Sequence, residues 1–246
     1  MLPGGSGSPT GHKSASLLEV LAAVFTVHRG TESDGRKGPQ LQLLLWRRTK
    51  EPDVGRWALP GGVVRDNEDV DASARRQLAE KVDLRQVTHL EQTGVFSDPQ
   101  RMPDVRMVAT GFLGLVPMDA DPSLPPDTAW HPVDALPEMA FDHASIADRA
   151  LQRLRAKLSY TNIGFALAPA GFTLAELGRI YAAALGHDVD VTNLQRILTR
   201  RGMLEPTGST APPGPSGGRP AAMYRFSIGD YRVTDPFAAF RPRNDG

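Results

Sequence analysis

A glycine-rich turn, an acidic residue and a helix with one polar face follow one another at fixed spacing, and this arrangement constrains the fold more than any other part of the chain. The turn is Trp57-Ala58-Leu59-Pro60-Gly61-Gly62, Glu68 comes next, and the helical segment contains Arg76-Gln77-Leu78-Ala79-Glu80-Lys81. Positions 77, 80 and 81 are three and four residues apart, so they share one face of a helix. Apolar residues at positions 70, 74, 78 and 82 form a second stripe, which predicts an amphipathic helix packed on a core.

From Gly62 through Glu68 to Arg76 the spacing resembles, without a gap, the motif of Nudix hydrolases. For active members of that family, the resemblance implies three carboxylates at positions 77, 80 and 81 that hold divalent cations against a diphosphate. Here Gln77 and Lys81 replace two of them, and Mg²⁺ requires hard anionic oxygens rather than an ammonium. We therefore predict no catalytic residues and no metal site, with hydrolysis absent or very weak and a pocket that survives.

Two residues of the motif have a structural interpretation as well. Glu68 and Arg76 are expected to form an ion pair that orients the turn and the helix. Asp83 stands where the motif ends in glycine, and aspartate is among the few residues that tolerate a left-handed backbone. Segments 17–28, 41–47 and 105–116 read as strands. Together with the motif helix, they predict an α/β/α sandwich of the Nudix type.

Length and composition predict two domains and exclude several kinds of site. The chain has 246 residues, of which 40% are hydrophobic, and no cysteine, so disulfides and cysteine-based zinc sites are impossible. No two of its six histidines have metal-ligand spacing. No apolar run is long enough to span a membrane and no signal peptide is present, so we expect a cytoplasmic protein with no membrane partner. The predicted boundaries are 1–14 for a disordered tail, 15–158 for the first domain and 159–240 for the second.

Two helices and a hairpin predict a winged helix-turn-helix fold for the second domain, which makes the whole chain an α+β protein. An amphipathic helix over residues 142–158 closes the first domain. Thr173 and Glu176 then have the spacing of a capping box, and the helix that they start should end near Gly186. Asp190 marks the start of the next helix.

The polar face of this last helix and the hairpin after it are the predicted DNA-binding surface. Polar and basic side chains opposite an apolar face suit phosphate and base-edge contacts in a major groove, although such a face can also be merely solvated. Between strands that start at Leu204 and Met223 lies a Pro- and Gly-rich stretch, residues 207–220, predicted to be an enlarged wing too flexible for a tight turn. The predicted DNA-binding residues are Thr192, Asn193, Gln195, Arg196, Thr199, Arg200, Arg219 and Arg225.

The distribution of charge agrees with this division. The formal net charge is zero, but Lys and Arg against Asp and Glu number 16 against 21 in residues 1–150 and 12 against 7 in residues 151–246. An acidic first part and a basic second part predict that nucleic acid binds only the second.

The two halves together resemble the Nudix-related transcriptional regulators of NAD metabolism. The resemblance rests on segments 140–143, 172–181 and 193–196, with Leu185-Gly186, Leu204-Glu205 and Gly218-Arg219-Pro220. It implies a homodimeric repressor of NAD biosynthesis or salvage genes that binds an operator in double-stranded DNA and senses ADP-ribose or a related nucleotide, with no bound cofactor. The expected ligand-binding residues are Trp57, Gly61, Gly62, Glu80, Lys81, Arg101 and Arg106.

These ligand-binding residues differ in their expected roles. Arg101 and Arg106 lie in a loop that resembles the ligand-side loop of the family, and a guanidinium offers phosphate a fork of donors without a metal. Surface solvation or pairing with Asp98 and Asp104 is the alternative. Trp57 is expected either to stack on a base or to pack in the core.

Two other functions remain open at the level of sequence. One is a magnesium-dependent Nudix pyrophosphohydrolase that uses Glu80, Glu68 and a carboxylate from elsewhere, such as Glu91 or Asp104. The other is an adaptor that binds RNA or protein. Magnesium-dependent turnover would identify the enzyme, and a palindromic DNA site with release by a metabolite would identify the repressor.

Overall fold

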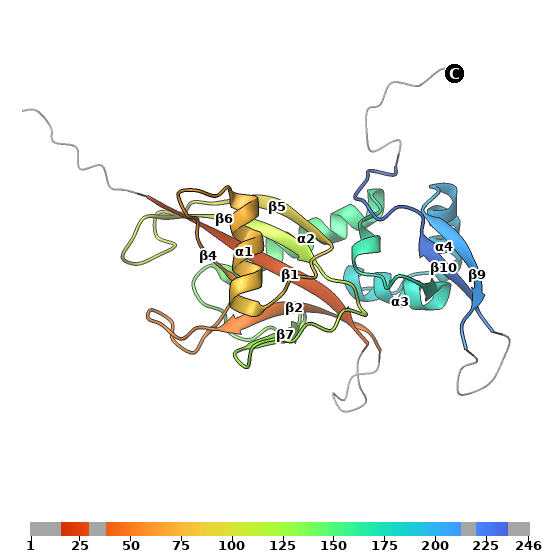
Figure 1. Cartoon of the computed structure of the whole chain (residues 1–246), viewed down its shortest axis with the longest axis horizontal. Coiled ribbons are helices and arrows are strands. Elements are labelled where there is room, and N and C mark those ends of the chain that lie inside the picture. The colour runs from red at the N-terminus through yellow and green to blue at the C-terminus, as the bar shows by residue number, and fades with distance from the viewer. Residues whose placement is uncertain (1–15, 30–37, 213–219, 236–246) are drawn as a thin grey trace, which may run out of the picture.

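The computed structural model describes residues 16–29, 38–212 and 220–235 (Figure 1). The predicted tail at residues 1–14 and the predicted DNA contact Arg219 lie outside the described residues. Within the parts that are described, no helix combines the length and the apolar character needed to cross a lipid bilayer.

A mixed seven-stranded sheet forms the centre of the first domain. Its order is β3-β2-β1-β6-β5, with β4 paired to β1 and β7 paired to β2. Strands β1 and β6 are parallel, and the other pairs are antiparallel. The strands are β1 (Leu17–His28), β2 (Gln40–Arg47), β3 (Trp57–Ala58), β4 (Gly61–Val63), β5 (His89–Phe96), β6 (Met107–Leu115) and β7 (Thr128–Pro132).

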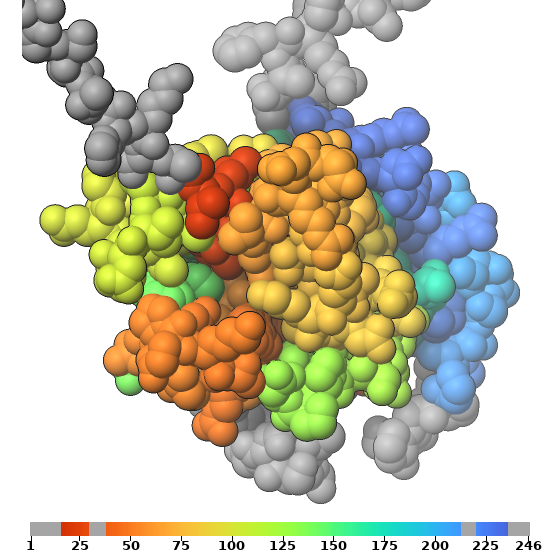
Figure 2. Space-filling view, turned by 60° about the vertical axis from the view of Figure 1, so that its left-hand side comes forward, coloured from red at the N-terminus to blue at the C-terminus, as the bar shows by residue number. Residues whose placement is uncertain are grey.

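One helix covers each face of this sheet, as the α/β/α prediction requires. Successive side chains of β1 point to opposite faces, so Val20, Ala22 and Val24 pack under α1 (Val70–Val82) while Leu21, Ala23 and Phe25 pack under α2 (His143–Tyr160). Helix α1 lies across the near face in Figure 1 and α2 behind it. The space-filling view shows α1 in the middle of one face, with the second domain at its side (Figure 2).

The second domain has the predicted helices and a small sheet. The order of elements is η2 (Ile163–Ala166), β8 (Phe172–Thr173), α3 (Leu174–Leu185), α4 (Val191–Arg200), β9 (Leu204–Thr210) and β10 (Ala222–Phe226). Strand β10 lies between β8 and β9. The winged helix prediction is therefore confirmed, and β8 completes the wing sheet in a way that the sequence did not indicate.

The structure corrects the predicted start of the flexible wing. Residues 207–210 belong to β9, where Thr210 is paired with Ala222 across a register shift. Gly208 has a φ of 78°, a conformation that glycine adopts without steric cost, and this allows the strand to continue. Residues 213–219 of the predicted wing lie outside the described part of the chain.

The predicted boundary between residues 158 and 159 falls inside a helix, because α2 continues to Tyr160. The apolar core is continuous across it. Leu21 of β1, Leu154 of α2, Leu177 of α3 and Leu198 of α4 are all buried in one cluster. The two domains therefore share a core and pack as one body.

Candidate functional site

The turn Leu59–Gly62 passes too close to the backbone of β1 for any residue but glycine at position 61, and it contacts a side chain of α1 at position 62. A Cβ atom on Gly61 would overlap the carbonyl oxygen of Val20, and one on Gly62 would lie 2.6 Å from Nε2 of Gln77. Both glycines belong to β4, which pairs with β1. Gly61 and Gly62, both predicted to bind the ligand, thus allow the backbone of the turn to pass closely between β1 and α1.

Two side chains hold the turn through the backbone of Leu59. The amide of Leu59 donates to Nδ1 of His143 (3.0 Å), and its carbonyl accepts from Nε1 of Trp46 (3.1 Å). His143 is buried, and burial lowers its pKa to about 4, so the ring is neutral and can accept this hydrogen bond. His143, the first residue of α2, therefore fixes a turn that lies more than 80 residues earlier in the chain.

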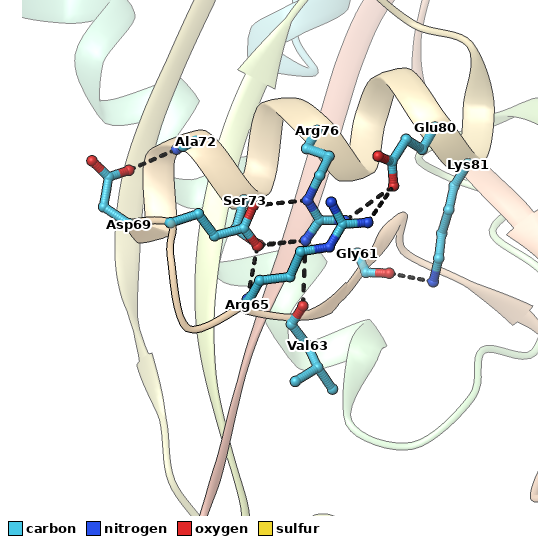
Figure 3. Close-up of polar contacts among 10 residues, drawn as sticks. Gly61, Val63, Arg65, Asp69, Ala72, Ser73, Arg76, Glu80 and Lys81 are labelled. Atoms are coloured by element: carbon cyan, nitrogen blue, oxygen red, sulfur yellow. Dashed lines mark hydrogen bonds and ion pairs between the residues drawn. The ribbon is translucent and has the colours of Figure 1, made fainter.

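Helix α1 presents an ion-paired surface beside the turn (Figure 3). Asp69 caps it by accepting from the amide of Ala72 (2.7 Å). Arg76 donates twice to Glu68, from Nη2 to Oε1 at 2.5 Å and from Nε to Oε2 at 2.8 Å, and this pairing holds the pKa of Glu68 at about 2. Glu80 accepts from Arg76 (3.1 Å), so the structural ion pair predicted for Glu68 and Arg76 is confirmed and extends to Glu80.

Lys81 points at the turn rather than into solvent. Its Nζ donates to the carbonyl of Gly61 and lies 4.7 Å from the ring centroid of Trp46 (Figure 3). Burial lowers the pKa of Lys81, and the charge of Arg48 lowers it further. Gln77 is also buried here, and its amide can donate to the same carbonyl (3.1 Å).

The residues beside this carbonyl do not fit the divalent cation that the Nudix fold implies. A magnesium ion would need oxygen ligands where the ammonium of Lys81 and the amide of Gln77 stand. The remaining carboxylates of the motif, Glu68 in the loop and Glu80 on the helix, are paired with Arg76. Within the described ranges, no group of three or more His, Asp or Glu side chains is placed to hold a metal.

The two carboxylates suggested as replacements lie elsewhere. Glu91 on β5 is paired with Lys157 of α2 (2.8 Å), so its side chain lies on the face of the sheet opposite α1. Asp104 is exposed in the loop between β5 and β6. Glu91 is therefore not placed beside Glu80.

Arg101 requires a correction, because its side chain is not available to a ligand. It is 1% exposed and paired on both sides, with Glu19 of β1 (2.6 Å) and with Asp142 just before α2 (2.8 Å). These partners are neither of the two aspartates considered from the sequence. Arg101 therefore acts as a structural connection between the loop, the sheet and α2.

Arg106 and Trp57 are better placed, but each also has a structural role. Arg106 is half-buried and donates to the backbone carbonyls of Ser97 (2.9 Å) and Asp98 (3.2 Å), which closes the loop. Trp57 is half-buried, with its ring edge-on to His131 at 4.3 Å between centroids. Its part in ligand binding remains a prediction.

Arg48 and Phe141 belong to this site and were missed from the sequence. The guanidinium of Arg48 lies 4.7 Å from the ring centroid of Phe141, and both side chains are half-buried. Phe141 has a φ of 50°, unusual for a bulky residue, and its amide donates to Asp53 (3.2 Å). The available sequence signal was the adjacent pair Arg47-Arg48 at the end of β2. In the structure, Arg48 is the second cation near Lys81.

The second domain presents α4 on its surface. Asp190 caps this helix by accepting from the amide of Asn193 (2.7 Å), and Thr173 caps α3 by accepting from that of Glu176 (3.1 Å). Leu194 and Leu198 are buried on the inner face. Both predicted helix starts are therefore confirmed.

The outer face of α4 is polar and open. Five of the predicted DNA-binding residues are exposed there and Gln195 is half-buried; the exposed five are Thr192, Asn193, Arg196, Thr199 and Arg200. Arg196 donates to the side chain of Asn193 (2.7 Å), which holds these two polar groups together. Arg225 on β10 is exposed and paired with Glu205 (3.1 Å). Their contacts with DNA remain predictions.

Comparison with known protein families explains why these two surfaces occur in one chain. Residues 24–154 match the NUDIX domain, and residues 164–226 match the NrtR DNA-binding winged helix domain. The ADPR responsive transcriptional repressor NtrR of Acinetobacter baylyi is 32% identical over 235 residues, covering 93% of this chain and 89% of the relative. The chain belongs to the NrtR family of Nudix-related regulators.

Two further similarities agree with this family. The crystal structure of Shewanella oneidensis NrtR complexed with a 27mer DNA aligns with a TM-score of 0.69 and 27% identity, over 85% of this chain and 93% of that one. An ADP-ribose pyrophosphatase of Methanocaldococcus jannaschii is 29% identical over 126 residues, covering 49% of this chain and 72% of the relative. The similarity to the Shewanella NrtR structure therefore extends over both domains, whereas the similarity to the pyrophosphatase covers about half of this chain.

Proposed function

We propose that this protein is a transcriptional repressor that binds operator DNA through its winged helix domain and releases it when the Nudix domain binds ADP-ribose or a related nucleotide. The observation that carries this proposal is the 32% identity to an ADP-ribose-responsive repressor over 93% of the chain, because the match includes both the sensor and the DNA-binding domain. The regulated genes are those of NAD biosynthesis or salvage, and the protein acts in the cytoplasm.

The sensor pocket binds its ligand without a metal and does not hydrolyse it. A diphosphate requires cations, and Lys81 and Arg48 supply them beside the turn. Arg106, on the loop between β5 and β6, is the third candidate. Hydrolysis would need a water activated by a metal or by a free carboxylate, but Glu68 and Glu80 are engaged by Arg76.

DNA binding requires two copies of the chain. One winged helix covers a modest area of DNA, so a homodimer on a pseudo-palindrome, with half-sites about one helical turn apart or a multiple of it, gives the required affinity. Ligand then shifts the dimer toward a geometry in which the two recognition helices no longer fit both half-sites.

The experiment is a fluorescence anisotropy titration with DNA from upstream of the protein's own gene and of its neighbours. ADP-ribose, NAD and AMP are added in separate arms, in EDTA and in magnesium. We expect ADP-ribose to release the DNA equally in both, and phosphate release assays with magnesium to show no turnover. If no DNA segment is bound above the non-specific level, or if none of the nucleotides changes its binding, the proposal fails.

Matched variants connect this response to the pocket. Lys81→Met removes the ammonium and keeps the length of the side chain, so the response to ADP-ribose should weaken at least tenfold while DNA affinity without ligand stays near normal. Arg85→Met is the control, because Arg85 is exposed beyond the end of α1 and pairs with Asp83. Equal responses from both variants would exclude Lys81 from the ligand site.

A further inference from the structure

The chain that leaves the wing returns to the first domain as a strap, which we define as residues 227–235. Its start is fixed to the second domain by hydrogen bonds from the amide and hydroxyl of Ser227 to the carbonyls of Met203 (3.0 Å) and Gly202 (2.6 Å). Its end is fixed to α2, where the amide of Thr234 donates to the carbonyl of Tyr160 (3.0 Å). The strap therefore ties the wing to the helix that covers the Nudix sheet.

Asn162, just after α2, forms hydrogen bonds with three backbone groups in the middle of the strap. Its side chain donates to the carbonyl of Asp230 (2.7 Å) and accepts from the amide of Arg232 (2.6 Å), and its own amide donates to the carbonyl of Arg232 (3.1 Å). Asn162 is buried, so these bonds form away from solvent. They fix the register in which the strap lies on α2.

Tyr231 of the strap lies between α2 and the Nudix sheet. Nζ of Lys157 donates to its hydroxyl (2.5 Å) and lies 4.1 Å from its ring centroid. The ring of His89, the first residue of β5, is 5.2 Å from that of Tyr231. A residue that follows the wing in sequence thus contacts a Nudix strand directly.

A half-buried carboxylate organises the other side of this contact. Glu91 on β5 is paired with Lys157 (2.8 Å), His89 (3.1 Å) and Arg153 (3.2 Å). Burial alone would raise the pKa of Glu91, but the hydrogen bonds from His89 and Lys157 outweigh it and lower the pKa to about 2. The side chain of Lys157 is 4% exposed. Because breaking a buried pair leaves a charge uncompensated, a movement of α2 should carry these contacts with it rather than separate them.

The opposite end of α2 contacts the candidate ligand site. His143, its first residue, accepts from the amide of Leu59 in the glycine-rich turn, and Asp142 is paired with Arg101 of the loop between β5 and β6. The helix has 18 residues and spans about 27 Å at about 1.5 Å per residue. One rigid element therefore joins the turn and the loop at its start to the strap at its end.

We propose that α2 and the strap are the element that couples the ligand site to the wing, with Tyr231 and its contacts to Lys157 and His89 as the point of transmission. This rests on the proposed function, since it supplies the route by which the sensor acts on DNA binding. A ligand that moves the turn or the loop shifts α2 along its length, and the polar contacts at Lys157 then move the strap. Tyr231 and Glu91 bind neither ligand nor DNA in this proposal; they hold Lys157 and His89 in contact with the strap.

The test measures coupling separately from either affinity. For each variant, the dissociation constant for operator DNA is determined without ADP-ribose and at saturation, and the affinity for ADP-ribose is determined without DNA. The ratio of the two DNA constants is the coupling factor, about 5–150-fold for ordinary allostery, and linkage requires operator DNA to weaken ADP-ribose binding by the same factor.

Three variants separate transmission from simple support of the fold. Tyr231→Phe removes only the hydroxyl, and the double variant Glu91→Gln with Lys157→Met replaces the buried charges with side chains of similar size. We expect both to keep each separate affinity within about threefold of the parent and to lower the coupling factor at least fivefold. Ser159→Ala removes an exposed hydroxyl of α2 that donates to the carbonyl of Ala156 in the same helix, and this control should couple like the parent.

Each outcome decides the question. If the parent binds DNA but shows no coupling, the proposed function has failed before the strap is tested. If the parent couples and Tyr231→Phe couples equally, the strap is not the route. A variant that weakens DNA binding by the same factor with and without ADP-ribose assigns Tyr231 a structural role and overturns the inference, even where the double variant does not fold.

Discussion

The buried histidine beneath the glycine-rich turn makes the stability of this protein depend on pH in a way that can be calculated. His143 is folded into a site where burial lowers its pKa to about 4 from the ordinary histidine value of 6.5. The folded protein therefore binds this proton less readily than the unfolded chain does. Its contribution to stability is fully present above about pH 6.5 and is lost as the pH falls through about 4.

The size of the effect follows from the two pKa values. Each tenfold difference in proton affinity between the folded and unfolded states corresponds to about 1.4 kcal/mol, so the difference between the two pKa values corresponds to about 3 kcal/mol. Between about pH 7.5 and about pH 5, where the folded form is still neutral, the free energy of unfolding should fall by about 2 kcal/mol. Protonation of the folded form would remove the acceptor for the amide of Leu59, so ligand affinity should fall only as the pH approaches about 4.

Urea unfolding of the parent and of His143→Asn, at about pH 7.5, 6 and 5, measures this contribution. The variant should be less stable at neutral pH, because it leaves a cavity and disturbs a buried hydrogen bond. Its stability should then fall by about 2 kcal/mol less than that of the parent between the two extremes. His187→Asn is the control, since His187 is exposed. Parallel pH curves for the parent and His143→Asn would refute the assignment of a neutral, buried ring.

Two remaining predictions concern the two binding surfaces. Gln77→Glu combined with Lys81→Glu should place two further carboxylates beside Glu80 and create magnesium affinity, detectable by calorimetry, together with weak hydrolysis of ADP-ribose; silence in both assays would mean that the turn itself does not suit a metal. Arg196→Ala or Arg200→Ala should weaken operator binding by about 1–3 kcal/mol if the side chain reads a guanine, and should flatten the salt dependence if it contacts phosphate. Parent-like binding by both alanine variants would show that α4 is not the recognition helix.

Local chemistry accounts for the part of the structure that the sequence predicted. Asp69, Thr173 and Asp190 each cap a helix through a side-chain bond to an amide three residues ahead, and such bonds depend on spacing alone. The strand alternation and the helical stripes were likewise visible in the sequence. The helix starts and the order of the two folds followed from these signals, whereas the start of the wing and the end of α2 did not.

Contacts between distant residues could not be predicted in the same way. Arg101 meets Asp142, which is 41 positions away, and Lys157 meets Glu91 on another element. Nothing in the sequence distinguishes a buried, doubly paired arginine from one that faces a phosphate, so Arg101 was assigned to the ligand. Arg48 was missed because its position beside the turn depends on how residues 47–56 fold, which the sequence alone does not show.

The continuous apolar core described above limits how this protein can be divided. Leu177 and Leu198 of the DNA-binding half share one buried cluster with Leu21 and Leu154 of the sensor half. A winged helix domain cut free after α2 would expose that surface to water, and exposed patches of this kind promote aggregation. We therefore expect a repressor that ignores its metabolite to arise from this chain by substitutions that leave the shared core in place, and not by deletion of the sensor.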